Sequence, residues 1–363
     1  MFIKDVFSMP SKANLYSNIK LLSEDNLKKY VLCHYNLQNA QIEQIKIKNT
    51  EKQRAVYKIT YKDKSYCLKK VYFDIEDLLF VYSSVEWLYR CGLKIPRFLA
   101  TDSGSRFVQY ENMLFILTPW VDGIKCDYDN DEHMVKSIRN LSKMHYVSRN
   151  FSPITGSSSR ENYSDISAST NRRYQRLLKN FNLAVKHNDN FSNIFNEHFD
   201  VNETLGKVSL NSSYIINTNN LCKSLCHLDY VNKNLLFDDN TDIWVIDFDK
   251  CEMDYCVHDI SYFFRRFLRR DNTKWNLDIT LKYLKEYEKT LSLNLDEYLY
   301  ILCYLAFPQK YWRISRDYFN NINKCNKNSF VKILLKSVKN EQVQLNFALN
   351  FIDYIQDRFD TKI

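Results

Sequence analysis

The segment from Leu225 to Asp249 contains polar residues whose types and spacing suit phosphoryl transfer. His227, Asp229 and Asn234 follow the order H-x-D-x-x-x-x-N, and Asp247 comes after a predicted hairpin. Phosphoryl transfer needs a carboxylate beside the attacking hydroxyl and oxygen ligands for the magnesium ion on the nucleotide. We therefore predict that Asp229 is the catalytic base and that Asn234 and Asp247 are magnesium ligands.

The predicted hairpin explains how distant ligands meet. Residues 235–237 and 243–246 are apolar, and the sequence DDNTD between them is typical of a turn. An antiparallel hairpin brings its first and last residues together. Asn234 precedes the first strand and Asp247 follows the second, so both are expected to face one metal ion. Asp249 is either a further ligand or a cap for the following segment.

Two residues near this segment are predicted to support it structurally. His227 is expected to hold the loop through backbone hydrogen bonds, and Asp259 is expected to cap a helix or tie down the catalytic loop. A metal-dependent hydrolase would instead use His227, Asp229, His258 and Asp259. That alternative lacks further histidine ligands at a suitable spacing.

Lys69 is the predicted phosphate-binding lysine, in the strand-like sequence YCLKKV. Side chains alternate between the two faces of a strand, so Lys70 on the other face is its rival. Glu86, seventeen residues later on a predicted helix, is the predicted partner of Lys69. A Lys–Glu pair would hold the lysine towards the phosphates. Glu76 is the alternative partner, but it lies close to the start of the helix.

The hydrophobic periodicity predicts which elements position these residues. Residues 14–36 and 75–91 have helical spacing, with Asp74 as a predicted cap, and strand-like runs flank the second helix. The predicted strands cover the region around Ile45 and Ile47 and residues 55–60, 65–71, 106–110 and 114–118. This order predicts an α+β fold of the two-lobed protein-kinase type. Its N-terminal lobe would be a small antiparallel β-sheet with one main helix.

The boundary between the lobes is predicted near Pro119–Gly123, whose backbone is expected to face an adenine ring. Residues 1–119 would form the nucleotide-binding lobe, and residues 120–363 a mostly helical catalytic and substrate lobe. Helices are predicted at 132–148, 172–199 and within 255–359, and the Ser-rich segment 151–170 is predicted to be a mobile loop. The hairpin around residue 240 is the only β-structure expected in the second lobe.

One part of a nucleotide site is missing from the sequence. The turn between the first two strands, NTEKQRA at 49–55, contains no glycine, although glycine lets backbone N–H groups approach phosphates closely. Each lost hydrogen bond to a charged group costs about 1.5–3 kcal/mol. We expect weak nucleotide binding unless Lys52 and Arg54 substitute.

Composition sets broader limits. The chain has 363 residues, which is long enough for two lobes, and 45% of them are hydrophobic, which is enough for a large core. The net charge of +8 suits an anionic ligand but does not by itself indicate a nucleic-acid-binding protein. Ten cysteines without C-x-x-C or zinc spacing favour reduced thiols. No signal peptide and no membrane span are expected, so the sequence predicts synthesis in the cytoplasm.

The segment 261–272 places Arg265, Arg266, Arg269 and Arg270 among Phe and Leu residues at helical spacing. Two interpretations stay open. The arginines could receive an acidic substrate or partner protein, or they could form a solvated helix face.

The sequence CHLDYVNKN followed by VIDFD resembles the aminoglycoside phosphotransferase and choline kinase group of kinase-like proteins. Within that group it is most similar to the CotS-like spore coat proteins. The resemblance extends over residues 28–320, through KKYVLCHYNLQ, LTPWVDGIKCDY, LSKMHYVSRNF, IDFDKCEMDYCVHDISYFFRRFLRR and LAFPQKYWRI. It implies a nucleotide in the cleft of a two-lobed fold, with Asp229 as base, Asn234 and Asp247 as metal ligands, and Lys69 as the lysine. Leu228 departs from the glycine usual in this group.

Two hypotheses for function follow. The first is a phosphotransferase that uses ATP and Mg²⁺ and transfers the γ-phosphate to an unidentified hydroxyl-bearing acceptor. The second is a catalytically weak or inactive pseudokinase that acts as a structural or assembly component of the spore coat. The missing glycines and the many Tyr and Cys residues favour the second hypothesis. The resemblance also implies assembly into the coat with other spore coat proteins as partners.

Overall fold

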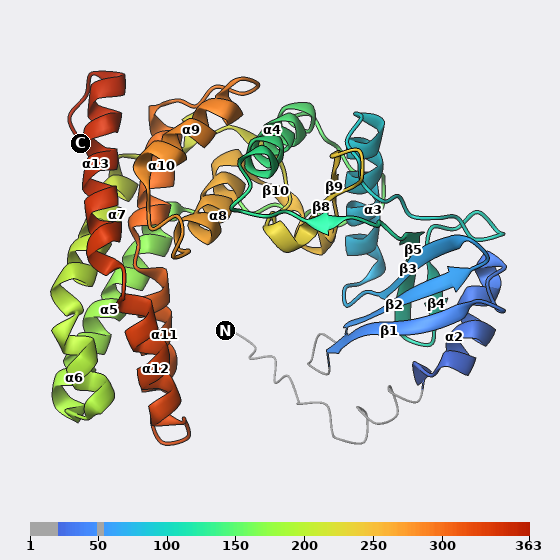
Figure 1. Ribbon diagram of the computed structural model, residues 1–363, viewed down its shortest axis with the longest axis horizontal. Helices are drawn as coiled ribbons and strands as arrows, with labels where there is room; N and C mark the ends of the chain where they lie inside the picture. The colour runs from blue at the N-terminus through green and yellow to red at the C-terminus, as the bar shows by residue number, and fades with distance from the viewer. Residues whose placement is uncertain (1–20, 49–53) are drawn as a thin grey trace, which may run out of the picture. The chain divides into compact units, whose positions relative to one another are not determined.

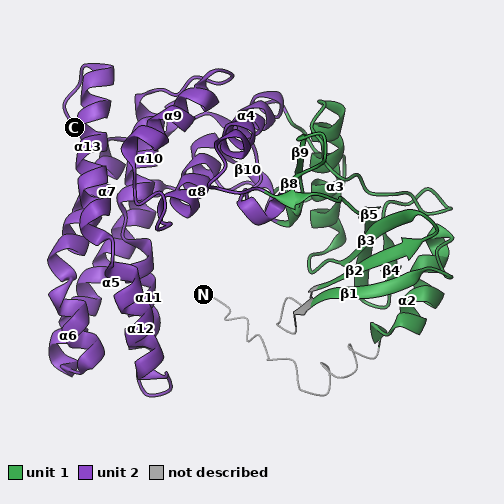
Figure 2. Ribbon diagram, in the orientation of Figure 1, with its two compact units in different colours: residues 1–125, 151–160, 236–249 green, residues 126–150, 161–235, 250–363 purple. Residues whose placement is uncertain are grey.

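The structure, a computed structural model, describes residues 21–48 and 54–363. Lys52 and most of the glycine-free turn therefore lie outside the described residues, as does the first part of the helix predicted at 14–36. The chain divides into two compact units, coloured separately in Figure 2. Unit 1 comprises Met1–Lys125, Phe151–Arg160 and Leu236–Asp249, and unit 2 comprises Cys126–Asn150, Glu161–Leu235 and Lys250–Ile363. The functional boundary between residues 119 and 120 stays a prediction.

Unit 1 contains a five-stranded antiparallel sheet with the order β1-β2-β3-β5-β4 (Figure 1). Its strands are β1 (Gln41–Lys48), β2 (Arg54–Tyr61), β3 (Lys64–Lys70), β4 (Val108–Tyr110) and β5 (Met113–Pro119). On one face Tyr57 of β2 pairs with Leu68 of β3, and Leu68 pairs with Leu117 of β5. These three side chains are buried in one hydrophobic cluster. The predicted strands are therefore confirmed, because alternation along each strand fills one core.

Two helices accompany this sheet. Helix α2 (Glu24–Tyr30) is capped at its N-terminus by Ser23, and its buried Leu27 belongs to the same hydrophobic cluster as the sheet. Helix α3 (Ile75–Arg90) is capped at its N-terminus by Asp74, whose carboxylate accepts a hydrogen bond from the Asp77 backbone at 2.9 Å. The predicted helix at 75–91 and its cap are thus confirmed.

The segment Phe151–Arg160 belongs to unit 1 and is attached to α3. The Ile154 backbone donates to the Ser83 hydroxyl at 3.1 Å, and the Ser158 hydroxyl donates to Asp77 at 2.6 Å. The ring of Phe151 meets those of Phe80 and Trp87 edge-on. A loop predicted to be mobile from its composition is therefore held by polar and aromatic contacts.

A smaller sheet has the order β6-β8-β9, with β6 (Ile124–Lys125), β8 (Leu235–Phe237) and β9 (Ile243–Val245). Strands β8 and β9 form at the apolar runs predicted for the hairpin. Gly123, just before β6, lies against the backbone of Phe237, where an added Cβ would come within 2.6 Å of the Phe237 carbonyl oxygen. The chain can pass β8 this closely because Gly123 has no side chain.

Unit 2 is mainly helical (Figure 1). Its helices are α4 (Asp131–Val147), α5 (Ile166–His187), α6 (Asn190–Glu197), α7 (Phe199–Ile215), α8 (Cys256–Leu268), α9 (Leu277–Glu288), α10 (Leu295–Ala306), α11 (Gln309–Asn320), α12 (Lys327–Val338) and α13 (Glu341–Phe359). Strands β7 (Lys223–Cys226) and β10 (Glu252–Tyr255) also pair antiparallel here. The expectation of a single β-hairpin beyond residue 120 was therefore wrong. Among the described residues, no helix combines the length and apolar composition needed to span a membrane.

Candidate active site

Lys69 lies on β3, and its ammonium group contacts two carboxylates that are far away in the sequence. The Lys69 Nζ atom is 2.6 Å from Oδ1 of Asp247 and 2.6 Å from Oδ1 of Asp249. The side chains of Lys69 and Asp249 are only 14% and 4% exposed. Burial opposes the lysine charge, but Asp249 and Asp247 outweigh this effect and raise the pKa of Lys69. The three groups therefore form a partly buried charged cluster in which the lysine stays protonated.

The chain around the two carboxylates is constrained. Asp247 follows β9 with a left-handed φ of 68°, and Asp249 lies in a short 3-10 helix, Phe248–Lys250. Arg160 donates to the backbone carbonyl of Asp249 at 2.8 Å and lies 3.8 Å from the Asp77 carboxylate of α3. Arg160 therefore links the acidic segment to α3, a role that sequence reasoning missed.

Glu86 does not form the ion pair predicted with Lys69. Its carboxylate accepts two hydrogen bonds from Arg97, at 2.8 and 2.6 Å, and the residue is buried on α3. Lys69 instead pairs with Asp247 and Asp249. The physical reason is geometric, since the planar Arg97 guanidinium fits a carboxylate through two parallel bonds. Burial lowers the pKa of the rival Lys70.

Asp229 belongs to unit 2, in the loop after β7. Its Oδ2 atom lies 3.2 Å from the Lys233 ammonium and 3.7 Å from that of Lys250, and its Oδ1 atom accepts a hydrogen bond from the Tyr262 hydroxyl at 3.3 Å. Asn234 is buried and donates through Nδ2 to the Asp229 carbonyl oxygen at 2.9 Å. The amide oxygen of Asn234 is thus the atom left to act as a metal ligand.

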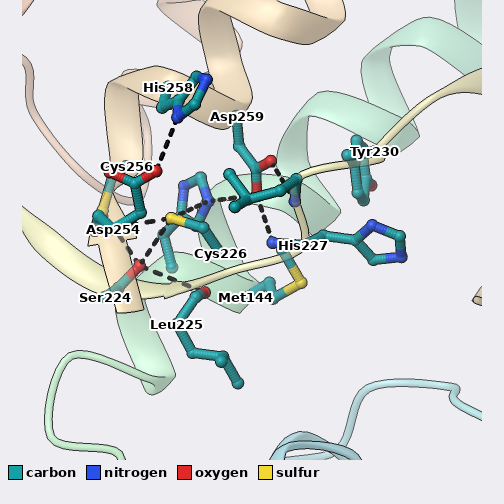
Figure 3. Close-up of polar contacts among 12 residues, drawn as sticks. Met144, Ser224, Leu225, Cys226, His227, Tyr230, Asp254, Cys256, His258 and Asp259 are labelled. Atoms are coloured by element: carbon teal, nitrogen blue, oxygen red, sulfur yellow. Dashed lines mark hydrogen bonds and ion pairs between the residues drawn. The ribbon is translucent and has the colours of Figure 1, made fainter. Parts of the chain in front are cut away.

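Asp259 holds the loop that carries Asp229 (Figure 3). This fully buried carboxylate on α8 accepts hydrogen bonds from the backbone N–H groups of His227 at 2.6 Å and Leu228 at 2.7 Å. Burial would raise the pKa of Asp259, but contacts with His145 and His227 outweigh burial and lower it. The imidazole Nδ1 of His227 in turn accepts from the Asp229 backbone at 3.2 Å. Both residues therefore support the loop geometry.

His145, Cys226 and Asp259 have potential ligand atoms within 4.8 Å of one another. The cluster is better explained as a structural hydrogen-bond network. Both Asp259 oxygens already accept short backbone bonds, and the Nδ1 atom of His145 lies 2.7 Å from the Tyr287 hydroxyl. His258, which a hydrolase would need, is 2.6 Å from the Asp254 carboxylate instead.

Leu228, between His227 and Asp229, has a left-handed backbone with φ of 55°. A non-glycine residue pays roughly 1–2 kcal/mol for this conformation. The two short hydrogen bonds to Asp259, from the amides of His227 and of Leu228 itself, hold the strained turn in place. The glycine that the resemblance led us to expect would fit this conformation without strain.

The structure groups the predicted residues within each unit. Lys69 and Asp247 contact each other in unit 1, whereas Asp229, Asn234, His227 and Asp259 surround one loop in unit 2. The convergence of these two groups around one nucleotide and one ion stays a prediction. Reasoning from the sequence did not find Arg160, Lys250 or Tyr262 as contributors, and no local pattern marked them.

The architecture defines a class, the kinase-like fold of aminoglycoside phosphotransferases. An aminoglycoside phosphotransferase from Alicyclobacillus acidocaldarius matches with a TM-score of 0.73 at 17% identity, over 83% of this chain and 90% of that chain. A spectinomycin phosphotransferase solved with ADP and spectinomycin matches with a TM-score of 0.60 at 18% identity, over 88% and 97%. A microcompartment-associated aminopropanol kinase matches with a TM-score of 0.55 at 14% identity, over 90% and 97%.

The family follows from a direct match. Residues 46–292, more than half of the chain, match the model of the phosphotransferase enzyme family. This protein therefore belongs to the phosphotransferase enzyme family.

Proposed function

We propose that this protein is a phosphotransferase that uses ATP and Mg²⁺ and transfers the γ-phosphate to a hydroxyl group of a small acceptor. The observation that carries the proposal is the contact of Lys69 with Asp247 and Asp249, residues 178 and 180 positions away in the sequence. Sequence reasoning assigned Lys69 to the phosphates and Asp247 to the metal, so their contact supports a common role. Family membership and the ADP in the spectinomycin phosphotransferase structure support an adenine nucleotide.

The acidic groups fit a magnesium ion. Asp247 and Asp249 each place an oxygen 2.6 Å from the same lysine nitrogen, so the two carboxylates converge in one small region. Mg²⁺ prefers hard oxygen ligands and is commonly held by one or two carboxylates together with phosphate oxygens. Asp247 and the amide oxygen of Asn234 would hold the ion, with Asp249 as a further ligand. When bound, the ion would neutralise charge on the phosphates.

The side chains of this chain would have separate tasks. Lys69 would bind phosphate oxygens, and the carboxylates beside it would keep its ammonium protonated and oriented. Asp229 would orient the acceptor hydroxyl and take its proton, while Tyr262, Lys233 and Lys250 would fix the position of the carboxylate. General-base catalysis of this kind contributes about 10²–10⁴-fold in rate.

Nucleotide binding is tested by thermal unfolding of the full chain with increasing ATP at fixed millimolar Mg²⁺. We expect the melting temperature to rise with ligand concentration, because a ligand that binds the folded state stabilises it. Lys69→Met should weaken binding about ten- to hundredfold, the loss expected for one or two charge-assisted hydrogen bonds. Lys64→Met, an exposed residue on the same strand, is the matched control and should leave the titration unchanged. A flat titration for the wild type would remove the proposal.

The base is tested separately. Asp229→Asn should abolish phosphoryl transfer while the ATP titration remains close to that of the wild type. Asp239→Asn, in the turn between β8 and β9, controls for loss of an acidic residue elsewhere. Unchanged transfer in Asp229→Asn would show that the base assignment is wrong.

The CotS-like sequence resemblance supports a second role, as a component assembled into the spore coat after synthesis in the cytoplasm. Leu228 precedes the proposed base in a left-handed turn, where the resemblance implies glycine, and this departure favours low turnover. A protein that binds Mg-ATP but transfers phosphate to no acceptor would support this pseudokinase role. Fractionation of spores with an antibody against the chain would test assembly into the coat.

A further inference from the structure

A pocket in unit 2 is lined by an unusual number of cationic side chains. It encloses about 430 Å³ between the end of α8, the junction of α10 with α11 and the junction of α12 with α13. Six basic residues line it, with Asp271 as the acidic member: Arg265, Arg269, Arg270, Lys310, Lys336 and Lys339. We call this the basic pocket. Its volume falls within the range of roughly 300–1,000 Å³ found for small-molecule sites.

Within the part of the chain that the structure describes, most of this positive charge has no acidic partner. Arg270 pairs with Asp129, and Lys339 lies 3.6 Å from Asp271. Arg265 donates to the neutral hydroxyl of Tyr304 at 2.7 Å. Across residues 21–48 and 54–363, no salt bridge to a carboxylate forms at the remaining pocket residues: Arg265, Arg269, Lys310 and Lys336. Concentrated charge of one sign in a concave site attracts a ligand of the opposite sign.

These cations also destabilise one another. Desolvation of its guanidinium by the surrounding side chains, together with the charges of Arg265 and Arg266, lowers the pKa of Arg269 to about 10, although the residue as a whole is exposed. Burial is likewise the main cause that lowers the pKa of Lys310, and Arg269 and Lys336 add to the effect. The groups therefore repel each other across the pocket in the free protein, and a bound anion would relieve this repulsion.

Helix α8 connects the basic pocket to the proposed base. Tyr262 donates to the Asp229 carboxylate, and Arg266 donates to the Tyr262 hydroxyl at 2.8 Å. Arg265 and Arg269 follow three and seven positions after Tyr262, which is the spacing of one helix face. With a rise of about 1.5 Å per residue, Arg269 lies roughly 10 Å along the axis from Tyr262. A small phosphorylated compound can span this length.

We infer that the basic pocket binds the anionic groups of a small, multiply charged hydroxyl compound, such as a sugar phosphate, and that this compound is the phosphate acceptor. The acceptor role rests on the proposed function, whereas anion binding does not. A concave pocket of about 430 Å³ on helix junctions suits a small molecule better than a nucleic acid, which needs an extended basic surface.

The first experiment measures binding of pyrophosphate and of fructose 1,6-bisphosphate to the nucleotide-free full chain by titration calorimetry. The double variant Arg269→Gln, Lys310→Gln should weaken binding at least tenfold, and Lys336→Gln alone about threefold or more. Lys332→Gln, an exposed residue one turn before Lys336 on α12, is the matched control and should bind as the wild type does. Lys69→Met tests whether the anions occupy the proposed nucleotide site instead.

Two outcomes would overturn the inference. One is the absence of saturable binding for both anions, and the other is binding that is lost in Lys69→Met but retained in the pocket variants. Circular dichroism checks folding, and the double variant should melt no lower than the wild type, because it removes mutually repelling charges.

The acceptor role is read from transfer of labelled phosphate to fructose 6-phosphate compared with fructose. We expect transfer to the phosphorylated sugar alone, and a loss of at least tenfold in kcat/KM in the pocket double variant. Transfer that favours the neutral sugar and is unaffected by the pocket variants would refute the inference while the proposed function stands. Anion binding through the pocket without Mg-ATP binding would instead refute the proposed function and, with it, the acceptor role.

Discussion

Asp259→Asn is the sharpest test of how the fold positions the proposed base. The Asp259 carboxylate is fully buried and accepts two backbone hydrogen bonds, from His227 at 2.6 Å and from Leu228 at 2.7 Å. An asparagine of the same shape has one oxygen and one NH₂ group. One of the two backbone N–H groups would therefore face a donor instead of an acceptor.

The expected loss of stability in Asp259→Asn follows from these two hydrogen bonds. Losing one charge-assisted hydrogen bond costs about 1.5–3 kcal/mol, and leaving a buried N–H without an acceptor adds about 1–3 kcal/mol. The free energy of unfolding of the variant should therefore be about 2.5–6 kcal/mol below that of the wild type. Domains are usually stable by only 5–15 kcal/mol, so this loss is large. Relief of the strain at Leu228 would return at most about 1–2 kcal/mol.

The stabilisation that the Asp259 carboxylate provides should decrease at low pH. The pKa of Asp259 is lowered in the folded protein, because contacts with His145 and His227 outweigh burial. The stabilisation by this carboxylate is therefore complete above the pKa of an unfolded aspartate, about 3.9, and is lost as the pH falls through the lower folded value. We expect the difference between wild type and Asp259→Asn to be constant from pH 5 to 8 and to shrink below pH 4.

Urea unfolding measures the difference in the free energy of unfolding between the wild type and Asp259→Asn. Hydrogen exchange at the amides of His227 and Leu228 shows whether the loss of stability is located in this loop. Both amides should exchange faster in Asp259→Asn. Asp254→Asn is the matched control, since Asp254 is also buried but its carboxylate contacts His258 and the Tyr255 backbone. A loss below 1 kcal/mol in Asp259→Asn, with both amides still protected, would refute the view that this carboxylate holds the loop.

Substitutions at three further positions test separate parts of the fold. In urea unfolding, Leu228→Gly should change the free energy of unfolding by less than about 1 kcal/mol. Leu228→Val should lower it by about 1–2 kcal/mol, because a β-branched residue fits the left-handed turn poorly. Equal effects of the two substitutions would contradict a strained backbone at Leu228. Gly123→Ala should lower the free energy of unfolding by about 1–3 kcal/mol, because its Cβ would meet the Phe237 carbonyl at 2.6 Å; an unchanged thermal midpoint would argue against this close approach. The contacts of Asp189 with Tyr318 and the Ser192 backbone outweigh burial and lower the pKa of Asp189 to about 2. In urea unfolding, Asp189→Asn should therefore cost about 1–2 kcal/mol at pH 7, and this cost should decline below pH 4 and disappear only below about pH 2; a loss independent of pH would disprove this.

The elements that local pattern alone determines could be predicted from the sequence. Helix α3 has apolar residues at helical spacing and an aspartate at its start, and both features appear in the structure. The strands of the larger sheet are rich in apolar residues, and alternate residues of β2 and β5 enter one core. Strands β7 and β10 were missed, because neither the KSLC of β7 nor the EMDY of β10 carries an apolar run, and each strand is only four residues long.

Side-chain partners could be predicted only where the chemistry required them. Lys69 and Asp247 were assigned to the same nucleotide, Lys69 to its phosphates and Asp247 to its metal ion, and the structure places the two side chains in contact. The partner assigned to Glu86 was wrong because helix position does not reveal that Arg97, eleven residues later, reaches the same carboxylate. Arg160 could not be found at all, since it lies in a polar segment without periodicity and becomes important only through its contact with Asp249.

The arginines of α8 show why the sequence left two interpretations open. Arg266 and Arg269 are exposed, as on a solvated face, while Arg265 is half-buried against Tyr304. Lys310 and Lys336, which complete the basic pocket, come from α11 and α12, so only the folded chain gathers these charges. Unpaired like charges in a concave site destabilise the folded state, and a protein retains them where an anion compensates. We therefore expect 0.5 M salt to raise the melting temperature of the wild type more than that of the Arg269→Gln, Lys310→Gln variant, because screening relieves the stronger repulsion in the wild type.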